Sequence, residues 1–245
     1  MLEEGVPAAM IENIAKAKGM PVGPLAVHDE VTLTLSMHVY ESDPTPNKLP
    51  YQERSYEITK KMVKEHGRTS KKDGKGFYDY PEGGKKKLWK ELGTIFNSDL
   101  ETMDKETVAK RIMHRQALEA FRCLEEGVLR SVVDGDLGSV LGWGFPIYTG
   151  GALSYIDFIG VKEFVADCDD FTNKYGERWT VPDSLRALAV SGNSIHKFGE
   201  KSAADIKKML EPELVEFANS IGIQASVDDL KKDTLTKVMS KLGYN

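Results

Sequence analysis

The sequence predicts an all-α protein made of two copies of one helical unit followed by a small helical tail. Three observations lead to this prediction. Short blocks of sequence occur twice in the same order, which is the signature of a repeated structural unit. Apolar residues recur at helical spacing between prolines and glycines that begin and end helices. The segment after Ser191 has helical patterns of its own but no counterpart in the first copy.

The repeat consists of three blocks whose order is kept. Residues 23–31 (GPLAVHDEV) recur as residues 151–159 (GALSYIDFI), so position 23 corresponds to position 151, an offset of 128. Upstream, LEEGV recurs with an offset of 122, and GMPV matches GFPI with an offset of 125. Because the offset only grows along the chain, we infer short insertions in the second copy. The first copy is expected to begin part-way through its unit.

The repeat divides the chain into residues 1–98, 99–199 and 200–245. The first unit opens with the last turn of a helix, which Gly5 ends in a left-handed conformation. A helix that starts at Pro7 then runs to Gly19, and a rigid proline-containing connector leads to Pro24, which suits the first turn of the next helix.

Residues 25–40 carry conflicting signals. The stretch from Val31 to Met37 alternates between apolar and polar residues, which by itself indicates a strand. The corresponding part of the second copy does not alternate, and we therefore expect a helix. The next helix is predicted over 51–66, with inward positions at Tyr56, Met62 and Val63.

Residues 68–80 (RTSKKDGKGFYDY) are predicted as loop. The lysines and glycines lack the preceding strand and following helix of a phosphate-binding P-loop. Phe77 and Tyr78 are expected to pack on the helices, because aromatic side chains bury large areas. Contact with a ligand is the alternative for this pair.

The second unit is predicted to begin with a long helix from the N-cap Asp104 to Glu126. The next helix starts at Ser131 or Asp134, and Gly150-Gly151 permits close approach of the backbone and positive φ. Further helices are expected to about Ile159, over 161–175 and over 183–190. In the tail, helices are predicted to begin at Ser202, to restart at Pro212, and to carry Leu230, Leu235, Val238 and Leu242.

Composition gives no sign of a membrane or nucleic-acid partner. The net charge is −5 with 40% hydrophobic residues, so no electrostatic attraction to anionic surfaces is expected. No run of about 18 apolar residues could span a bilayer. The N-terminus lacks a signal sequence, and Cys123 and Cys168 form no CxxC motif, so a reducing, cytoplasmic location is expected.

Motifs that would carry chemistry are missing. No GxGxxG follows a strand, and GxSxG, HExxH and EF-hand patterns do not occur. His114 lies near two arginines, and we expect it to be solvated or to face a partner. Asp29 and Asp157 occupy the same place in the two copies, which favours a helix cap or an internal hydrogen bond over a catalytic role.

Several stretches together resemble the C-terminal helical domains of the L-3-hydroxyacyl-CoA dehydrogenase family. They are MLEEGVPAAMI, GMPVGPLAVHDEV, GRTSKKDGKGFYDY, EAFRCLEEGV and GWGFPIYTGGALSYID. The resemblance is greatest to the alpha subunits of multifunctional fatty-acid oxidation complexes, which carry this helical domain twice. It covers roughly residues 1–195.

The resemblance implies a role without catalytic residues on this chain. In the family, an N-terminal Rossmann domain binds NAD and supplies a His–Glu pair and a Ser. The helical domain adds an Asn, and this chain opens just after the place where that Asn would stand. The complete enzyme would oxidise L-3-hydroxyacyl-CoA with NAD. The resemblance assigns contact with the acyl group to Pro21, Val22, Gly23 and Pro24, with a purely structural helix corner as the alternative.

Two alternatives to this enzymatic role stay open. In the first, the helical pair is an interaction module that binds another copy of itself, a Rossmann-bearing half or a thiolase subunit. The tail, residues 200–245, resembles small SAP-like helical modules, some of which bind DNA. Its nearly balanced charge favours a helical appendage or docking segment over nucleic-acid binding.

Overall fold

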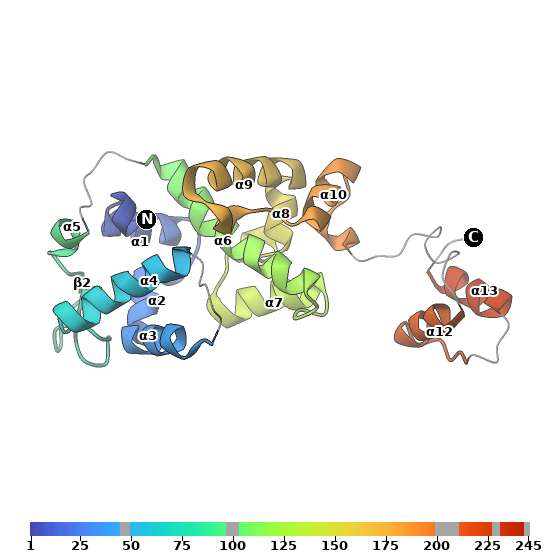
Figure 1. The fold of residues 1–245 in the computed structure, drawn as a ribbon, viewed down its shortest axis with the longest axis horizontal. Helices are drawn as coiled ribbons and strands as arrows, with labels where there is room; N and C mark the ends of the chain where they lie inside the picture. The colour runs from blue at the N-terminus through green and yellow to red at the C-terminus, as the bar shows by residue number, and fades with distance from the viewer. Residues whose placement is uncertain (45–49, 97–102, 199–210, 227–230, 243–245) are drawn as a thin grey trace. The chain divides into compact units, whose positions relative to one another are not determined.

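The computed structural model describes residues 1–44, 50–96, 103–198, 211–226 and 231–242. Helices make up most of these residues, so the predicted all-α class is confirmed (Figure 1). Contacts between Cα atoms group residues 1–196 in one unit and residues 197–245 in another. The sequence repeat lies inside the first of these units.

The first repeat begins with a 3-10 turn that ends at Gly5, whose φ of 91° is the predicted left-handed cap. Its elements are η1 (Leu2–Glu4), α1 (Ala8–Ala17), α2 (Pro24–Val31), α3 (Leu33–Ser42), α4 (Pro50–Lys60), the π-helical turn η2 (Lys61–Glu65), β1 (Tyr78–Asp79), β2 (Lys87–Leu88) and α5 (Leu92–Ile95).

The second repeat consists of helices and short 3-10 turns. Its elements are α6 (Lys105–Glu125), α7 (Val132–Trp143), η3 (Ile147–Thr149), α8 (Ser154–Ile159), α9 (Val161–Tyr175), η4 (Glu177–Trp179), α10 (Asp183–Ser191) and η5 (Ile195–Lys197). Asp104 caps α6 as predicted, because its carboxylate accepts from the backbone N–H groups of Glu106 and Thr107.

The alternating stretch after Val31 is helical, as predicted, but a break at Thr32 interrupts it. Thr32 has φ 70° and ψ 134°, and it separates α2 from α3. The equivalent residue at the same offset of 128 is Gly160, with φ 95° and ψ 121° between α8 and α9. The two repeats therefore make the same sharp bend, and the first copy makes it with a β-branched residue for which this conformation is strained.

The segment 68–80, predicted as loop, contains a short strand. β1 pairs with β2 in antiparallel register, Tyr78 opposite Leu88. The prediction that Phe77 and Tyr78 pack on the helices is confirmed, since both side chains are buried. Arg68 fixes the segment through bonds from its guanidinium to the carbonyl oxygens of Gly76 and Tyr78.

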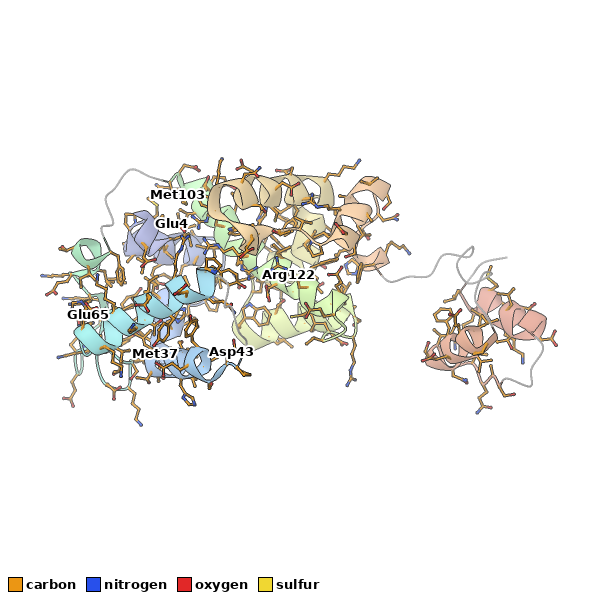
Figure 2. The ribbon with its side chains drawn as sticks, viewed as in Figure 1. Glu4, Met37, Asp43, Glu65, Met103 and Arg122 are labelled. Carbon is orange, nitrogen blue, oxygen red and sulfur yellow. The ribbon has the colours of Figure 1, made fainter. Side chains whose placement is uncertain are left out.

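Helix α6 joins the cores of both repeats. Val108 and Ile112, in its first half, belong to the apolar core of the first repeat, while Leu118 and Phe121 are buried further along. Met103 and Arg122, near the two ends of α6, mark its course among the side chains in Figure 2.

The expectation that His114 is solvated or faces a partner is wrong. The side chain is completely buried in the second repeat. Its Nε2 lies 3.1 Å from an Asp167 carboxylate oxygen, its Nδ1 lies 3.0 Å from the Tyr155 hydroxyl, and its ring stacks on Phe164. Burial lowers the pKa of His114 to about 4, so the imidazole is neutral at pH 7 and serves the packing of this core.

Two connectors, residues 19–24 after α1 and residues 144–146 after α7, touch each other reciprocally. A Cβ on Gly19 would lie 3.2 Å from Cβ of Pro146, and a Cβ on Gly144 would lie 2.5 Å from Cγ of Pro21. Gly19 corresponds to Gly144 and Pro21 to Pro146, both with the offset of 125. The glycine of each connector thus faces the proline of the other, which is the contact pattern of a two-fold interface. The two repeats thus pack as an internal pseudo-dimer at this point.

The unit of residues 197–245 contains a helical pair, α12 (Glu211–Ser220) and α13 (Lys231–Lys241). Leu214, Ala218 and Val238 form its buried core. The Asn219 side chain exchanges two hydrogen bonds with the backbone of Ala225, which closes the turn after α12. The helix start predicted at Ser202 and the core position Leu230 lie outside the described residues.

Candidate functional site

A buried carboxylate holds the corner between α1 and α2. Glu12 on α1 is 1% exposed. Its Oε1 accepts from the backbone N–H of Leu25 at 2.7 Å, and its Oε2 accepts from the Tyr78 hydroxyl at 2.6 Å. Leu25 stands in the first turn of α2, where backbone N–H groups have no partner within the helix. Glu12 therefore caps α2 from a distance and ties it to β1.

The same interaction occurs in the second repeat. Asp136 on α7, at an offset of 124 from Glu12, accepts from the backbone N–H groups of Leu153 and Ser154 at 2.8 and 3.0 Å. Its second oxygen accepts from the Ser154 hydroxyl. The shorter aspartate reaches the helix start because Gly151 lets the backbone come closer. Each repeat thus uses one buried acid to fix the angle between two successive helices, α1 and α2 in the first repeat and α7 and α8 in the second.

A glycine makes room for the carboxylate in each case. A Cβ on Gly23 would lie 2.3 Å from Glu12 Oε2, and a Cβ on Gly151 would lie 2.4 Å from Asp136 Oδ1. Gly23 has φ −74° and ψ 155°, which any residue adopts, so only the carboxylate requires glycine there. Gly151 has φ 134°, as predicted for a position that favours glycine.

The repeated pair Asp29 and Asp157 forms the hydrogen bonds predicted for a structural role. Asp29 accepts from the backbone N–H groups of Phe77 and Tyr78 at 2.7 and 2.9 Å. Asp157 accepts from the backbone N–H of Ile195 at 2.8 Å. Both aspartates therefore attach the closing segment of their own repeat. Burial raises the pKa of Asp29, against the opposing effect of its hydrogen bonds.

The connector Pro21–Pro24 lies directly over this corner. Pro21 is exposed, Val22 and Pro24 are half-buried, and Gly23 is buried under the Glu12 carboxylate. Pro24 begins α2 as predicted. The side chain of Pro21 packs on Gly144 of the second connector. Pro21, Val22 and Pro24 are thus accessible at the surface, whereas Gly23 is enclosed beneath it.

Sequence reasoning missed Glu12 and Asp136. Their signal is present in the repeat, because the two acids keep an offset intermediate between those of the flanking blocks. Glutamate in the first repeat corresponds to aspartate in the second, so a comparison of identical residues does not find this pair. Glu12 has both carboxylate oxygens engaged in hydrogen bonds, which makes it a helix cap rather than an acceptor for a substrate proton.

Other features of this corner are apolar or neutral. His28 is largely enclosed, and burial lowers its pKa. Burial and the hydrogen bond to Glu12 raise the pKa of Tyr78, so its hydroxyl stays protonated and continues to donate.

Among the described residues no cluster of three or more His, Cys, Asp or Glu side chains suits a metal ion. Within the same residues, every helix is too short or too polar to cross a membrane.

The Gly23→Ala substitution tests the carboxylate corner. We expect it to lower the free energy of unfolding by about 3 kcal/mol, since Glu12 must leave its two partners while it stays buried. Gly138→Ala in α7 is the control, because a Cβ there meets nothing within 4 Å, and it should raise stability by about 0.5–1 kcal/mol.

Urea unfolding followed by tryptophan fluorescence measures this difference. All three tryptophans lie within residues 1–196, so the signal reports that unit alone. Equal stabilities for Gly23→Ala and Gly138→Ala would show that the carboxylate can move aside without loss and would refute the cap.

The sequence is similar to that of several known proteins. Residues 1–80 match the family model described as 3-hydroxyacyl-CoA dehydrogenase, C-terminal domain. The fatty acid oxidation complex subunit alpha of Vibrio campbellii is 34% identical over 179 residues, which are 73% of this chain and 25% of the relative. The subunit of the same name from Shewanella frigidimarina is 33% identical over 203 residues, 80% of this chain and 28% of the relative.

The chain thus spans about a quarter of the length of the curated relatives that it matches. The matched region covers most of the two repeats whose helices, buried acids and glycines are described above. Residues 1–80 therefore carry the C-terminal domain of the 3-hydroxyacyl-CoA dehydrogenase family, and the chain is a homologue of fatty acid oxidation complex alpha subunits.

Proposed function

We propose that this chain is the substrate-side and assembly part of an NAD-dependent L-3-hydroxyacyl-CoA dehydrogenase of fatty-acid β-oxidation, and that it is inactive alone. The observation that carries the proposal is the family match over residues 1–80. That stretch contains α1, the connector, α2 and the Phe77–Tyr80 segment, which are all joined through Glu12 and Asp29.

In this proposal the connector Pro21–Pro24 lines the cleft in which the acyl group lies. Two prolines restrict its backbone, and Gly23 is enclosed by the Glu12 carboxylate. A wall of this kind loses little conformational entropy when a substrate binds against it. The contact of Pro21 with Gly144 supports the alternative, in which the connector serves only to join the two repeats.

The residues of this chain do not fit a nicotinamide dinucleotide. Dinucleotides bind where a glycine-rich turn joins a parallel strand to a helix. The strands within the described residues are β1 and β2, which are two residues each and antiparallel. We therefore assign NAD, and the groups that transfer hydride and proton, to a Rossmann domain of the complete enzyme.

A chimera tests the proposal. Residues 1–198 of this chain replace the aligned segment of the Vibrio campbellii alpha subunit, and NADH formation from L-3-hydroxyacyl-CoA is measured by absorbance. We expect activity from the chimera and none from this chain alone. Val22→Ala should raise KM for the acyl-CoA several-fold and leave KM for NAD unchanged, because it removes two methyl groups from the proposed wall.

Val128→Ala is the matched control, since that valine is exposed outside the connector, and it should change neither KM. A folded chimera without NADH formation would contradict the proposal, as would NADH formation by this chain alone. Equal KM values for the Val22→Ala chimera and its parent would assign the connector to a purely structural role.

An exposed apolar face favours a second function, that of an interaction module. Val133, Leu137 and Leu141 follow at intervals of four along α7, and the last is 81% exposed. Trp143 at the end of this helix and Ile147, Tyr148 and Phe158 after it are exposed apolar residues as well. Large exposed apolar patches mark protein interfaces, and the partner could be another copy, a Rossmann-bearing half or a thiolase subunit.

Light scattering with size-exclusion chromatography tests the first of these partners. If a second copy covers the face, the chain forms a dimer, and Leu141→Lys converts it to a monomer. Val39→Lys, which places the same charge at an exposed valine on α3, should leave the dimer intact. A monomer at every concentration of the unaltered chain would exclude self-association.

A further inference from the structure

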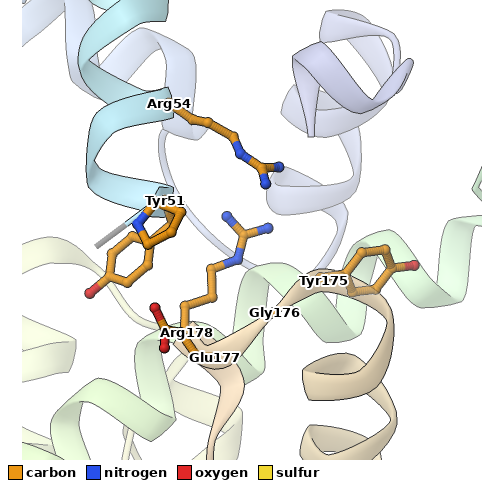
Figure 3. A pocket seen from close by; sticks show the side chains of 7 residues that line it. Tyr51, Arg54, Tyr175, Gly176, Glu177 and Arg178 are labelled. Carbon is orange, nitrogen blue, oxygen red and sulfur yellow. The ribbon is translucent and has the colours of Figure 1, made fainter. Parts of the chain in front are cut away.

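A pocket of about 290 Å³ opens between the two repeats, away from the connector. Its lining comes from the start of α4, the end of α9 and η4 (Figure 3). The residues that line it are Pro50, Tyr51, Arg54, Tyr175, Gly176, Glu177 and Arg178. Neither proposed function above uses these side chains.

Two guanidinium groups point toward one another in this pocket (Figure 3). Arg54 reaches in from α4, and none of the hydrogen bonds or ion pairs of the described residues includes its side chain. Arg178 reaches in from η4 and bonds through Nη2 to Glu4 at 3.2 Å, while its buried Nε has no partner among the described residues. Two like charges that share a space repel each other, and an anion between them would offset this repulsion.

The walls of the pocket are held by other arginines. The Arg111 guanidinium lies 3.8 Å from the centre of the Tyr175 ring, and the Arg115 guanidinium lies 5.6 Å from the centre of the Tyr51 ring. Arg115 also donates to the backbone oxygen of Arg178 at 3.0 Å. These contacts fix the rings and the η4 backbone, so the pocket exists before any ligand enters.

The charged groups around the pocket have a net positive charge. Glu4 is bound to both Arg111 and Arg178 and is already shared between them. Glu177 also lines the pocket, with its carboxylate directed away from the space between the two guanidiniums (Figure 3). Burial and the nearby Arg111 guanidinium lower the pKa of Arg178. The space between Arg54 and Arg178 therefore lacks a matching negative charge.

We propose that this pocket binds a phosphate monoester, with its oxygens between Arg54 and Arg178 and the rest of the molecule against Tyr51. Guanidinium groups present paired N–H donors that match phosphate oxygens, and two of them can bind one tetrahedral anion from opposite sides. The cavity has space beyond a single phosphate group, and its aromatic wall suits a flat ring system. The proposal does not depend on the dehydrogenase function.

Isothermal titration calorimetry of the full chain, in phosphate-free buffer at low salt, tests the proposal with adenosine 5′-monophosphate, orthophosphate and adenosine. We expect the monophosphate to bind and adenosine alone not to bind. Arg54→Ala should weaken binding of the monophosphate about tenfold or more, because it removes one charged donor group. Arg186→Ala, which removes an arginine paired with Asp169 outside the pocket, should leave the affinity unchanged.

The relative affinities of the other ligands show which kind of anion the pocket binds. Orthophosphate as tight as the monophosphate would identify free phosphate as the source, whereas much weaker orthophosphate binding would identify a nucleotide-like ester. The proposal is overturned if neither phosphate compound binds, if Arg54→Ala binds as tightly as the unaltered chain, or if a dicarboxylate such as succinate binds more tightly than both phosphates.

Discussion

The architecture depends on a buried carboxylate that lies on a glycine and caps the next helix. Glu12 does this over Gly23, and Asp136 does it over Gly151. A charged group so enclosed is stable only when its oxygens are satisfied, and the free N–H groups at a helix start supply the donors. The interaction fixes the angle between α1 and α2 and between α7 and α8, and with it the connector that joins each pair.

The symmetry of the molecule follows from this corner. Because both connectors are held in the same shape, Gly19 can meet Pro146 while Gly144 meets Pro21. The bend that follows α2 and α8 is also the same in both copies, with Thr32 and Gly160 in similar conformations of positive φ. Asp29 and Asp157 then attach the last segment of each repeat. One set of polar contacts, used twice, positions the connectors and the helices on either side of them.

Most of the helices could be predicted from the sequence, because prolines, glycines and caps such as Asp104 act locally and leave a local pattern. The break at Thr32 could not, since threonine is not a residue that favours positive φ and only the repeat supplies the reason. His114 was misjudged because two neighbouring arginines suggested solvent, whereas Arg111 itself is buried beneath Tyr175. The pocket between Arg54 and Arg178 could not be predicted either. These residues are more than a hundred positions apart in the sequence, and no local pattern indicates that their side chains meet.

Native-state hydrogen exchange of single amides tests the carboxylate corner most directly. The amides of Leu25 and Leu153 stand at the start of α2 and α8, where they have no partner within the helix and would otherwise exchange rapidly. Ser184, in the first turn of α10, is the internal reference, because that helix has no side-chain cap. The account predicts that Leu25 and Leu153 exchange as slowly as amides in the middle of α6. Exchange of both at the rate of Ser184 would contradict it.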